Sequence, residues 1–237
     1  MKKLIVIFFA VFFFFAAAYP AGEKMYMKQG SYELEAGQLK EAVFDLTKAI
    51  ELDPKDGQAY YLRGSAEMML GDKKSALKDL TSTIELAPDY VYAYNNRAAI
   101  ELMTGDYKAA LKDLNRAIEL KPDYSNGYNA RGAVEFEMGD KKKAVDDVNK
   151  AIELNPKNGA AYDNLGEFKY KTGDYKGAVK ACTKAVKYDP TINEAYYYRG
   201  LAEDKLGDKK NSVKDLNKAK EMGYNPEADD VNVKKQP

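Results

Sequence analysis

Prolines recur at a fixed interval of 34 residues through most of this chain, at Pro54, Pro88, Pro122, Pro156 and Pro190. A fixed period of this length is typical of a chain built from repeated units that stack on one another. Counting from the prolines defines six units, which span residues 23–56, 57–90, 91–124, 125–158, 159–192 and 193–226. The fourth residue of every unit is Tyr and the fifteenth is Gly. The whole segment 23–226 is therefore predicted to be one repeat array.

Each unit is predicted to fold as two amphipathic helices, because apolar residues recur at steps of three and four on both sides of the invariant Gly. That Gly is predicted to end the first helix, since glycine adopts positive φ at little cost. The Asp that follows it in five units, as Asp72 follows Gly71, is predicted to cap the second helix. The second helices are predicted to end two residues before Pro, at Leu52, Leu86, Leu120, Leu154 and Tyr188.

Small residues indicate where the helices touch. The eighth position of every unit is Gly or Ala, and the twentieth is Ala in the first five units. Such residues allow close approach of two helices, and an isolated pair cannot bury both of its apolar faces. The pairs are therefore predicted to stack into a solenoid. In the last unit, Ser212 and Lys220 replace apolar or small residues, and we interpret them as a polar cap on the end of the array.

With an aromatic residue at position 4, Gly at 8, Ala at 20 and 27 and Pro at 32 of a 34-residue period, the chain resembles the tetratricopeptide repeat family over residues 23–226. The resemblance implies an all-α fold, a right-handed α-solenoid of antiparallel helix pairs. It also implies a concave groove, lined by the first helices, that binds a peptide or helix of a partner protein. The pentatricopeptide RNA-binding family fits less well, since its period is 35 residues and its surface is basic.

Position 7 departs from the family, because four units carry Arg where the family usually has Leu. A Glu follows each Arg by four residues, and an Asp stands at position 23; unit five changes all three, to Leu165, Lys169 and Ala181. The joint loss predicts a structural trio in which the Arg pairs with both carboxylates, since an unpaired buried charge is costly. Decoration of helix surfaces is the alternative. The trio residues are Arg63, Glu67, Asp79, Arg97, Glu101, Asp113, Arg131, Glu135, Asp147, Arg199, Glu203 and Asp215.

The resemblance places the groove at positions 2, 5, 9, 12 and 13 of the first helices. Tyr and Met there offer large, adaptable contact area, and Asn can pair with a peptide backbone. The candidate partner-binding residues are Met27, Tyr61, Met68, Tyr92, Asn95, Met103, Asn129, Phe136, Tyr170 and Tyr197. The alternative is that several of these side chains pack between repeats.

Composition argues against catalysis. The chain has no His and a single Cys, so the usual general base, most nucleophile pairs and most zinc sites are missing. Cys182 is expected to be a small buried hydrophobe, because Leu or Val occupies its position in the other units. The 37 basic and 37 acidic residues alternate along the chain, which argues against a nucleic-acid surface. We expect no enzyme, no cofactor and no metal ion.

The N-terminus predicts an export signal over residues 1–18, in which Lys2 and Lys3 precede an apolar run and three alanines. Residues 19–22 form a short linker, and residues 227–237 are expected to hold a short terminal capping helix and a disordered tail. The predicted location is periplasmic or extracellular, with membrane attachment only if the signal stays uncleaved. Other proteins are the expected partners of a monomer or hetero-complex subunit. The two open functions are an adaptor that binds in the groove and a structural subunit of a cell-envelope or secretion assembly.

Overall fold

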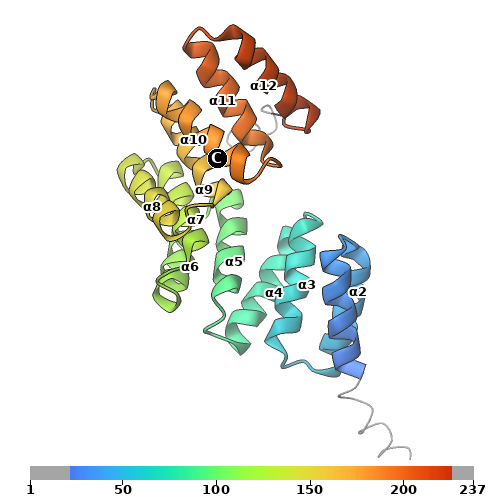
Figure 1. Ribbon diagram of the computed structural model, residues 1–237. Helices are drawn as coiled ribbons and strands as arrows, with labels where there is room; N and C mark the ends of the chain where they lie inside the picture. The colour runs from blue at the N-terminus through green and yellow to red at the C-terminus, as the bar shows by residue number, and fades with distance from the viewer. Residues whose placement is uncertain (1–21, 226–237) are drawn as a thin grey trace, which may run out of the picture. The chain divides into compact units, whose positions relative to one another are not determined.

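The computed structural model describes residues 22–225, where every regular element is an α-helix (Figure 1). Residues 22–35 are helical. The helices that follow are α2 (Leu39–Leu52), α3 (Gly57–Met69), α4 (Lys73–Leu86), α5 (Val91–Thr104), α6 (Tyr107–Leu120), α7 (Ser125–Glu137), α8 (Lys141–Leu154), α9 (Gly159–Lys171), α10 (Tyr175–Tyr188), α11 (Asn193–Lys205) and α12 (Lys209–Glu221). The predicted signal segment, most of the linker and the predicted capping helix and tail lie outside the described residues. Between residues 22 and 225, no helix is long and apolar enough to cross a membrane.

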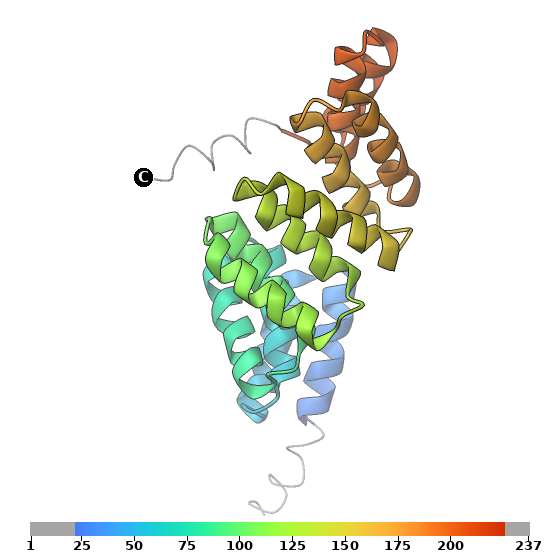
Figure 2. The same cartoon turned by 90° about the vertical axis from the view of Figure 1, so that its left-hand side faces the viewer.

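The described residues divide into two compact units, 22–109 and 110–225. In the first, α2 contacts α3, α3 contacts α4 and α4 contacts α5, and α3 also contacts α5. Figures 1 and 2 show the helices of this unit side by side from two directions. In the second, α7 to α12 contact one another in chain order, and α9 contacts both α7 and α11. Within each unit the first helices of neighbouring repeats therefore touch each other, and we call the side that they form in that unit its first-helix face.

Helix boundaries follow the period of the sequence. The first helices α3, α5, α7, α9 and α11 begin at Gly57, Val91, Ser125, Gly159 and Asn193, which are 34 residues apart. The second helices α2, α4, α6, α8 and α10 end at Leu52, Leu86, Leu120, Leu154 and Tyr188. These ends confirm the prediction that was based on the prolines, because a Pro two residues later cannot continue the hydrogen-bonded helix.

The turn inside each pair is built from backbone and one carboxylate. Gly71 has φ of 83°, and the corresponding Gly of every repeat also has positive φ. The Asp72 amide donates to the Glu67 carbonyl at 2.9 Å, which closes the end of α3. The Asp72 side chain then accepts a hydrogen bond from the Ser75 amide and begins α4. The predicted caps are confirmed here and at Asp106, Asp140, Asp174 and Asp208.

Small residues let the two helices of a pair approach closely, as predicted. A Cβ atom on Gly132 would lie 2.8 Å from the Ala144 carbonyl oxygen, and one on Gly166 would lie 2.2 Å from Cys182 Sγ. Cys182 is fully buried, and burial raises the pKa of its thiol, so it is a core residue as expected. Any larger side chain at these glycines has to push the helices apart.

Neighbouring repeats share apolar clusters, which is the physical basis of the stack. Ala42 and Leu46 of α2 pack with Ala66 of α3, in the next repeat. The interpretation of Ser212 as an end-capping residue is wrong, because its side chain is only 2% exposed and its carbonyl oxygen faces Gly200 of the same pair. Position 20 faces the inside of its own pair. Lys220 is exposed, as the interpretation requires.

Candidate functional site

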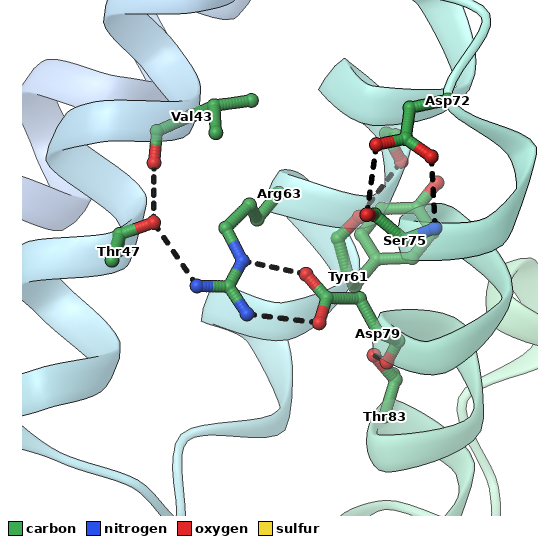
Figure 3. A network of polar contacts seen from close by, with 9 residues as sticks. Val43, Thr47, Tyr61, Arg63, Asp72, Ser75, Asp79 and Thr83 are labelled. Carbon is green, nitrogen blue, oxygen red and sulfur yellow. Dashed lines mark hydrogen bonds and ion pairs between the residues drawn. The ribbon is translucent and has the colours of Figure 1, made fainter.

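Arg63 ties two repeats together (Figure 3). Its Nε donates to Asp79 Oδ2 at 2.6 Å and its Nη2 to Asp79 Oδ1 at 2.9 Å, a bidentate pair between α3 and α4. Its Nη1 donates to Thr47 Oγ1 at 3.0 Å, on α2 of the preceding repeat. Thr47 Oγ1 in turn donates to the Val43 carbonyl at 2.7 Å. One guanidinium therefore holds its own helix pair closed and joins that pair to the repeat before it.

The same arrangement recurs in the second compact unit, in the fourth and sixth repeats. Arg131 donates to both oxygens of Asp147 at 2.5 and 2.9 Å and to Asn115 Oδ1 at 2.8 Å. Arg199 donates to both oxygens of Asp215, and its Nη1 lies 3.5 Å from Thr183 Oγ1. The link to position 25 of the preceding repeat was not predicted. Its signal in the sequence is that Thr or Asn stands at this position in every repeat: Thr47, Thr81, Asn115, Asn149, Thr183 and Asn217.

Arg97 also donates to this position, with Nη1 3.2 Å from Thr81 Oγ1. Its Nε lies 3.9 Å from Glu101 Oε1. Asp113, its predicted partner, belongs to the other unit, so that pairing stays a prediction.

The Glu of the trio lies beside the guanidinium but does not accept its hydrogen bonds in three repeats. Glu67, Glu135 and Glu203 each have a buried Oε2 without a hydrogen-bond partner among residues 22–225. Burial, and then repulsion from the nearby Asp, raises the pKa of Glu67 and Glu135 to about 7. The expected pairing of Arg with both carboxylates is thus seen for the Asp and not for these Glu side chains, because the fork of the guanidinium is occupied by the two Asp oxygens.

The fifth repeat, residues 159–192, has an apolar cluster in place of the polar trio. Leu165 and Ala181 are buried there together with Phe168. The Phe136 ring stacks on Phe168 with centroids 4.1 Å apart and is 9% exposed. The prediction that Phe136 lines a binding groove is therefore wrong, since its ring is buried in the contact between two repeats. Lys169 pairs with Asp174 at 2.7 Å instead of facing an Arg.

The candidate binding residues of the first compact unit, residues 22–109, differ in how far their side chains are exposed to solvent. Met27 and Met68 are half-buried and pack against the apolar clusters. Tyr61 is half-buried as well; its ring lies 4.8 Å from that of Tyr90, and its hydroxyl accepts from Asn96 Nδ2 at 3.5 Å. These three side chains therefore serve mainly to pack the repeats.

Two of the candidates and one neighbour present apolar surface to solvent. Tyr92 is 44% exposed, Met103 is 60% exposed, and Met69, which was not among the candidates, is 60% exposed. Tyr92 and Met103 are separated by three helical turns on α5, so they lie on the same side of that helix. Asn95 lies between them, half-buried, and its Oδ1 has no hydrogen-bond partner among the described residues. Asn96 of α5 reaches Ser65 of α3 at 3.4 Å, which joins the two helices on this side.

Of the remaining candidates in the second compact unit, Asn129 and Tyr170 contact the next repeat, whereas Tyr197 contacts a residue of its own repeat. Asn129 Oδ1 accepts from Asn164 Nδ2 at 2.9 Å. The Tyr170 ring lies 5.8 Å from Tyr198, and the Tyr197 ring lies 4.6 Å from Tyr224. All of these side chains are half-buried.

Asp163 is the most perturbed carboxyl on this first-helix face. Its Oδ1 is buried without a hydrogen-bond partner in the described part of the chain. Burial, followed by repulsion from Glu194 and Glu167, raises its pKa to about 8. Within residues 22–225, no group of three or more His, Cys, Asp or Glu side chains is placed to hold a metal ion.

Comparison with known proteins agrees with this architecture. Models of the tetratricopeptide repeat match residues 27–80, 91–124, 125–158, 159–192 and 194–222. No curated protein sequence matches the chain at a significant level.

Several solved structures are similar in fold. MamA from Desulfovibrio magneticus RS-1 is 23% identical with a TM-score of 0.61, over 72% of this chain and 97% of that one. A chain of the APC/C hetero-tetramer Cut9–Hcn1 is 19% identical with a TM-score of 0.78, over 90% of this chain and 42% of that one. YrrB is 20% identical with a TM-score of 0.51, over 81% of this chain and 98% of that one. At such identities the likeness shows the fold alone. Because the matched repeats cover most of its length, the chain belongs to the tetratricopeptide repeat family.

Proposed function

We propose that this protein is an exported adaptor that holds a peptide or helical segment of another protein against its first-helix face. Membership of the family supplies the class of function, since tetratricopeptide repeats are protein-interaction modules. The proposal includes no catalytic step. The Glu at position 11 and the Asp at position 23 recur together in five of the six repeats, which is the behaviour of structural groups.

The observation that carries the proposal is the exposed apolar surface of α3 and α5. Met69, Tyr92 and Met103 keep about half of their surface in solvent on two helices that contact each other. Tyr and Met are well suited to binding, because both give large contact area and Met adapts to varied partners. An apolar segment of a partner protein fits this chemistry.

Two similar structures support a binding role by their own descriptions. YrrB is described as a tetratricopeptide repeat protein with an unusual peptide-binding site, and Cut9 is found in a hetero-tetramer with Hcn1. Both descriptions concern those proteins, and they support the class of function proposed for this chain.

Photo-crosslinking in cells tests the binding surface. A photoreactive amino acid is placed at Met69, Tyr92 or Met103, and as a matched control at Lys78 or Glu85, which are exposed on α4. We expect the three first-helix positions to crosslink to the same partner segment, and the α4 positions to give none of that product. Equal crosslinking from α4, or no product from any first-helix position, would contradict the proposal.

Export is tested separately by the mass of the mature chain. The basic start and apolar run of residues 1–18 support a signal that is removed after Ala18. We expect the protein to be recovered outside the cytoplasm with Tyr19 as its first residue. Recovery in the cytoplasm with residues 1–18 intact would refute export and leave the crosslinking test unaffected.

A further inference from the structure

The first repeat keeps the surroundings of an arginine that it lacks. Tyr26, Glu33 and Asp45 stand at the positions that flank the guanidinium in other repeats, but position 7 is Gln29. Unit five shows the contrast, because it lost the Arg together with both carboxylates. In unit one, the cation alone has been replaced.

The arginine environment is known from the other repeats. Arg63, Arg131 and Arg199 each pair with the Asp at position 23 and lie over the ring of the Tyr at position 4, with distances of 5.7, 5.4 and 5.4 Å to the ring centroid. The Glu at position 11 lies beside the guanidinium and lowers the energy of the positive charge. Tyr26, Glu33 and Asp45 would supply the same three groups to a cation in the first repeat.

Gln29 satisfies only part of this environment. Its Nε2 donates to Glu33 Oε1 at 2.8 Å. Glu33 is 8% exposed, and its buried Oε2 has no hydrogen-bond partner among the described residues. A carboxylate buried to this extent without a cation is unfavourable, and a neutral amide cannot offset its charge.

A surface hollow opens at this place, and its charge is mainly negative. The hollow is lined by Glu33, Lys40, Glu41, Phe44 and Asp45, which include three carboxylates and one amine. The Phe44 ring is 62% exposed, and Lys48 Nζ already lies 5.9 Å from its centroid. The ring therefore presents a face that attracts cations. In the other repeats, the residue at this position is Lys78, Lys112, Asp146, Lys180 or Lys214.

The rim beside the hollow is apolar and uncovered. Met25 and Tyr32 are 59% and 64% exposed, and they form one stripe with Gln29 at steps of four and three residues. At the same two positions of later repeats the side chains are buried, as for Ala59, Ala66, Ala93, Ile100, Val134, Ala161, Phe168, Ala195 and Ala202. The second helix of the preceding repeat covers those side chains, as α2 covers Ala59 and Ala66. The first repeat thus presents a face shaped to receive a helix.

We propose that this face binds an apolar helix of another protein that inserts an arginine side chain between Glu33 and Asp45. The guanidinium would take the place that Arg63 fills within its own repeat, and apolar residues of the same helix would cover Met25 and Tyr32. The occupant follows from charge complementarity, since the hollow holds three carboxylates against one Lys. An organic cation fits better than a metal ion, because within residues 22–225 no three His, Cys, Asp or Glu side chains are placed closely enough to hold a metal ion. The site is separate from Met69, Tyr92 and Met103.

The first test restores the internal arginine. In the full chain, Gln29→Arg is expected to raise the thermal midpoint by a few degrees, because the new guanidinium fills the site from within. Gln58→Arg, at an exposed position of α3, is the matched control and is expected to leave the midpoint unchanged. A Gln29→Arg variant that is no more stable than the control would refute the proposal that this site fits a guanidinium.

The second test uses a defined probe. A fluorescent amphipathic helical peptide with one arginine among leucines is compared with the same peptide carrying citrulline, its uncharged isostere. We expect the arginine peptide to bind roughly tenfold tighter, and this preference to disappear in Glu33→Gln and in Gln29→Arg, as measured by anisotropy. Equal binding of the two peptides, or an unchanged preference in both variants, would overturn the proposal. Sedimentation that shows self-association abolished by Glu33→Gln would make a second copy the occupant and would also overturn it.

Discussion

Arg63 and Asp79, 16 residues apart in sequence, form a bidentate ion pair whose side chains are 17% and 3% exposed. The pair joins the two helices of one repeat, while the remaining guanidinium nitrogen reaches the repeat before it. Its stability therefore affects both the helix pair and the stack.

A double-mutant cycle measures this pair. Arg63→Ala and Asp79→Ala are each expected to destabilise the array by about 3 kcal/mol, since each leaves the other charge buried and unpaired. The double variant is expected to lose less than the sum, with a coupling energy of about 2 kcal/mol. Urea denaturation of the four proteins gives these values. The same cycle on the exposed pair Lys48 and Glu51 is the control, and equal coupling in both cycles would refute a special role for the buried pair.

Thr47 tests the link between repeats. Thr47→Val keeps the shape and removes the oxygen that accepts from Arg63, so a loss of about 1 kcal/mol is expected. Thr172→Val is the control, because the Thr172 hydroxyl donates to the carbonyls of Phe168 and Lys169 in its own helix. Hydrogen exchange is expected to show faster opening at the junction of α2 and α3 in the first variant. A loss of protection that is equal in both variants would contradict the link.

The buried Glu side chains predict a pH dependence of stability. The pKa of Glu67 and Glu135 is about 7 in the folded state against an ordinary value of 4.5. The folded state therefore binds protons at these two groups more tightly than the unfolded state does. The stability that the protonated Glu67 and Glu135 contribute is fully present below pH 4.5 and is lost as the pH rises through 7. Urea midpoints are expected to be higher at pH 6 than at pH 8. Glu67→Gln with Glu135→Gln should reduce this slope, and the remainder is expected from Asp163, whose pKa is raised to about 8. A slope that is unchanged in the double variant would exclude Glu67 and Glu135 as contributors.

Unit five predicts that the trio can only be installed as a set. Leu165→Arg alone buries a charge beside Ala181 and is expected to cost about 3 kcal/mol. Adding Ala181→Asp supplies the partner and is expected to recover much of that loss. Leu165→Met, which nearly conserves volume, is the control and should cost less than about 1.5 kcal/mol. Denaturation curves that place the single and double variants at the same stability would show that the pair does not form there.

The local parts of the fold were predictable from the sequence, because they depend on residues near one another. Gly71, Asp72 and the end of α4 at Leu86 follow from backbone sterics and capping, and these predictions are confirmed. The family was recognisable for the same reason, since each repeat presents these signals again.

The exposed surface was harder to predict, because the side chains of two successive residues in an α-helix point about 100° apart. One of two neighbouring residues can therefore be in the core while the other faces solvent. Met68 packs in the core and Met69 faces solvent, although both belong to the expected groove positions. Phe136 is buried in a cluster that includes Phe168 of the next repeat, which stacks on it. The bond from Arg63 to Thr47 likewise depends on how two repeats stack, which no single repeat encodes.

The most direct test of the adaptor is the affinity for the partner segment that crosslinks to α3 and α5. Met69→Ala with Tyr92→Ala is expected to raise the Kd at least about tenfold, or about 1.4 kcal/mol, by calorimetry on the folded chain. Leu86→Ala with Val213→Ala removes exposed apolar side chains from second helices and should leave the Kd unchanged. An unchanged Kd in the first variant, or an equal loss in the second, would contradict binding by the first-helix face.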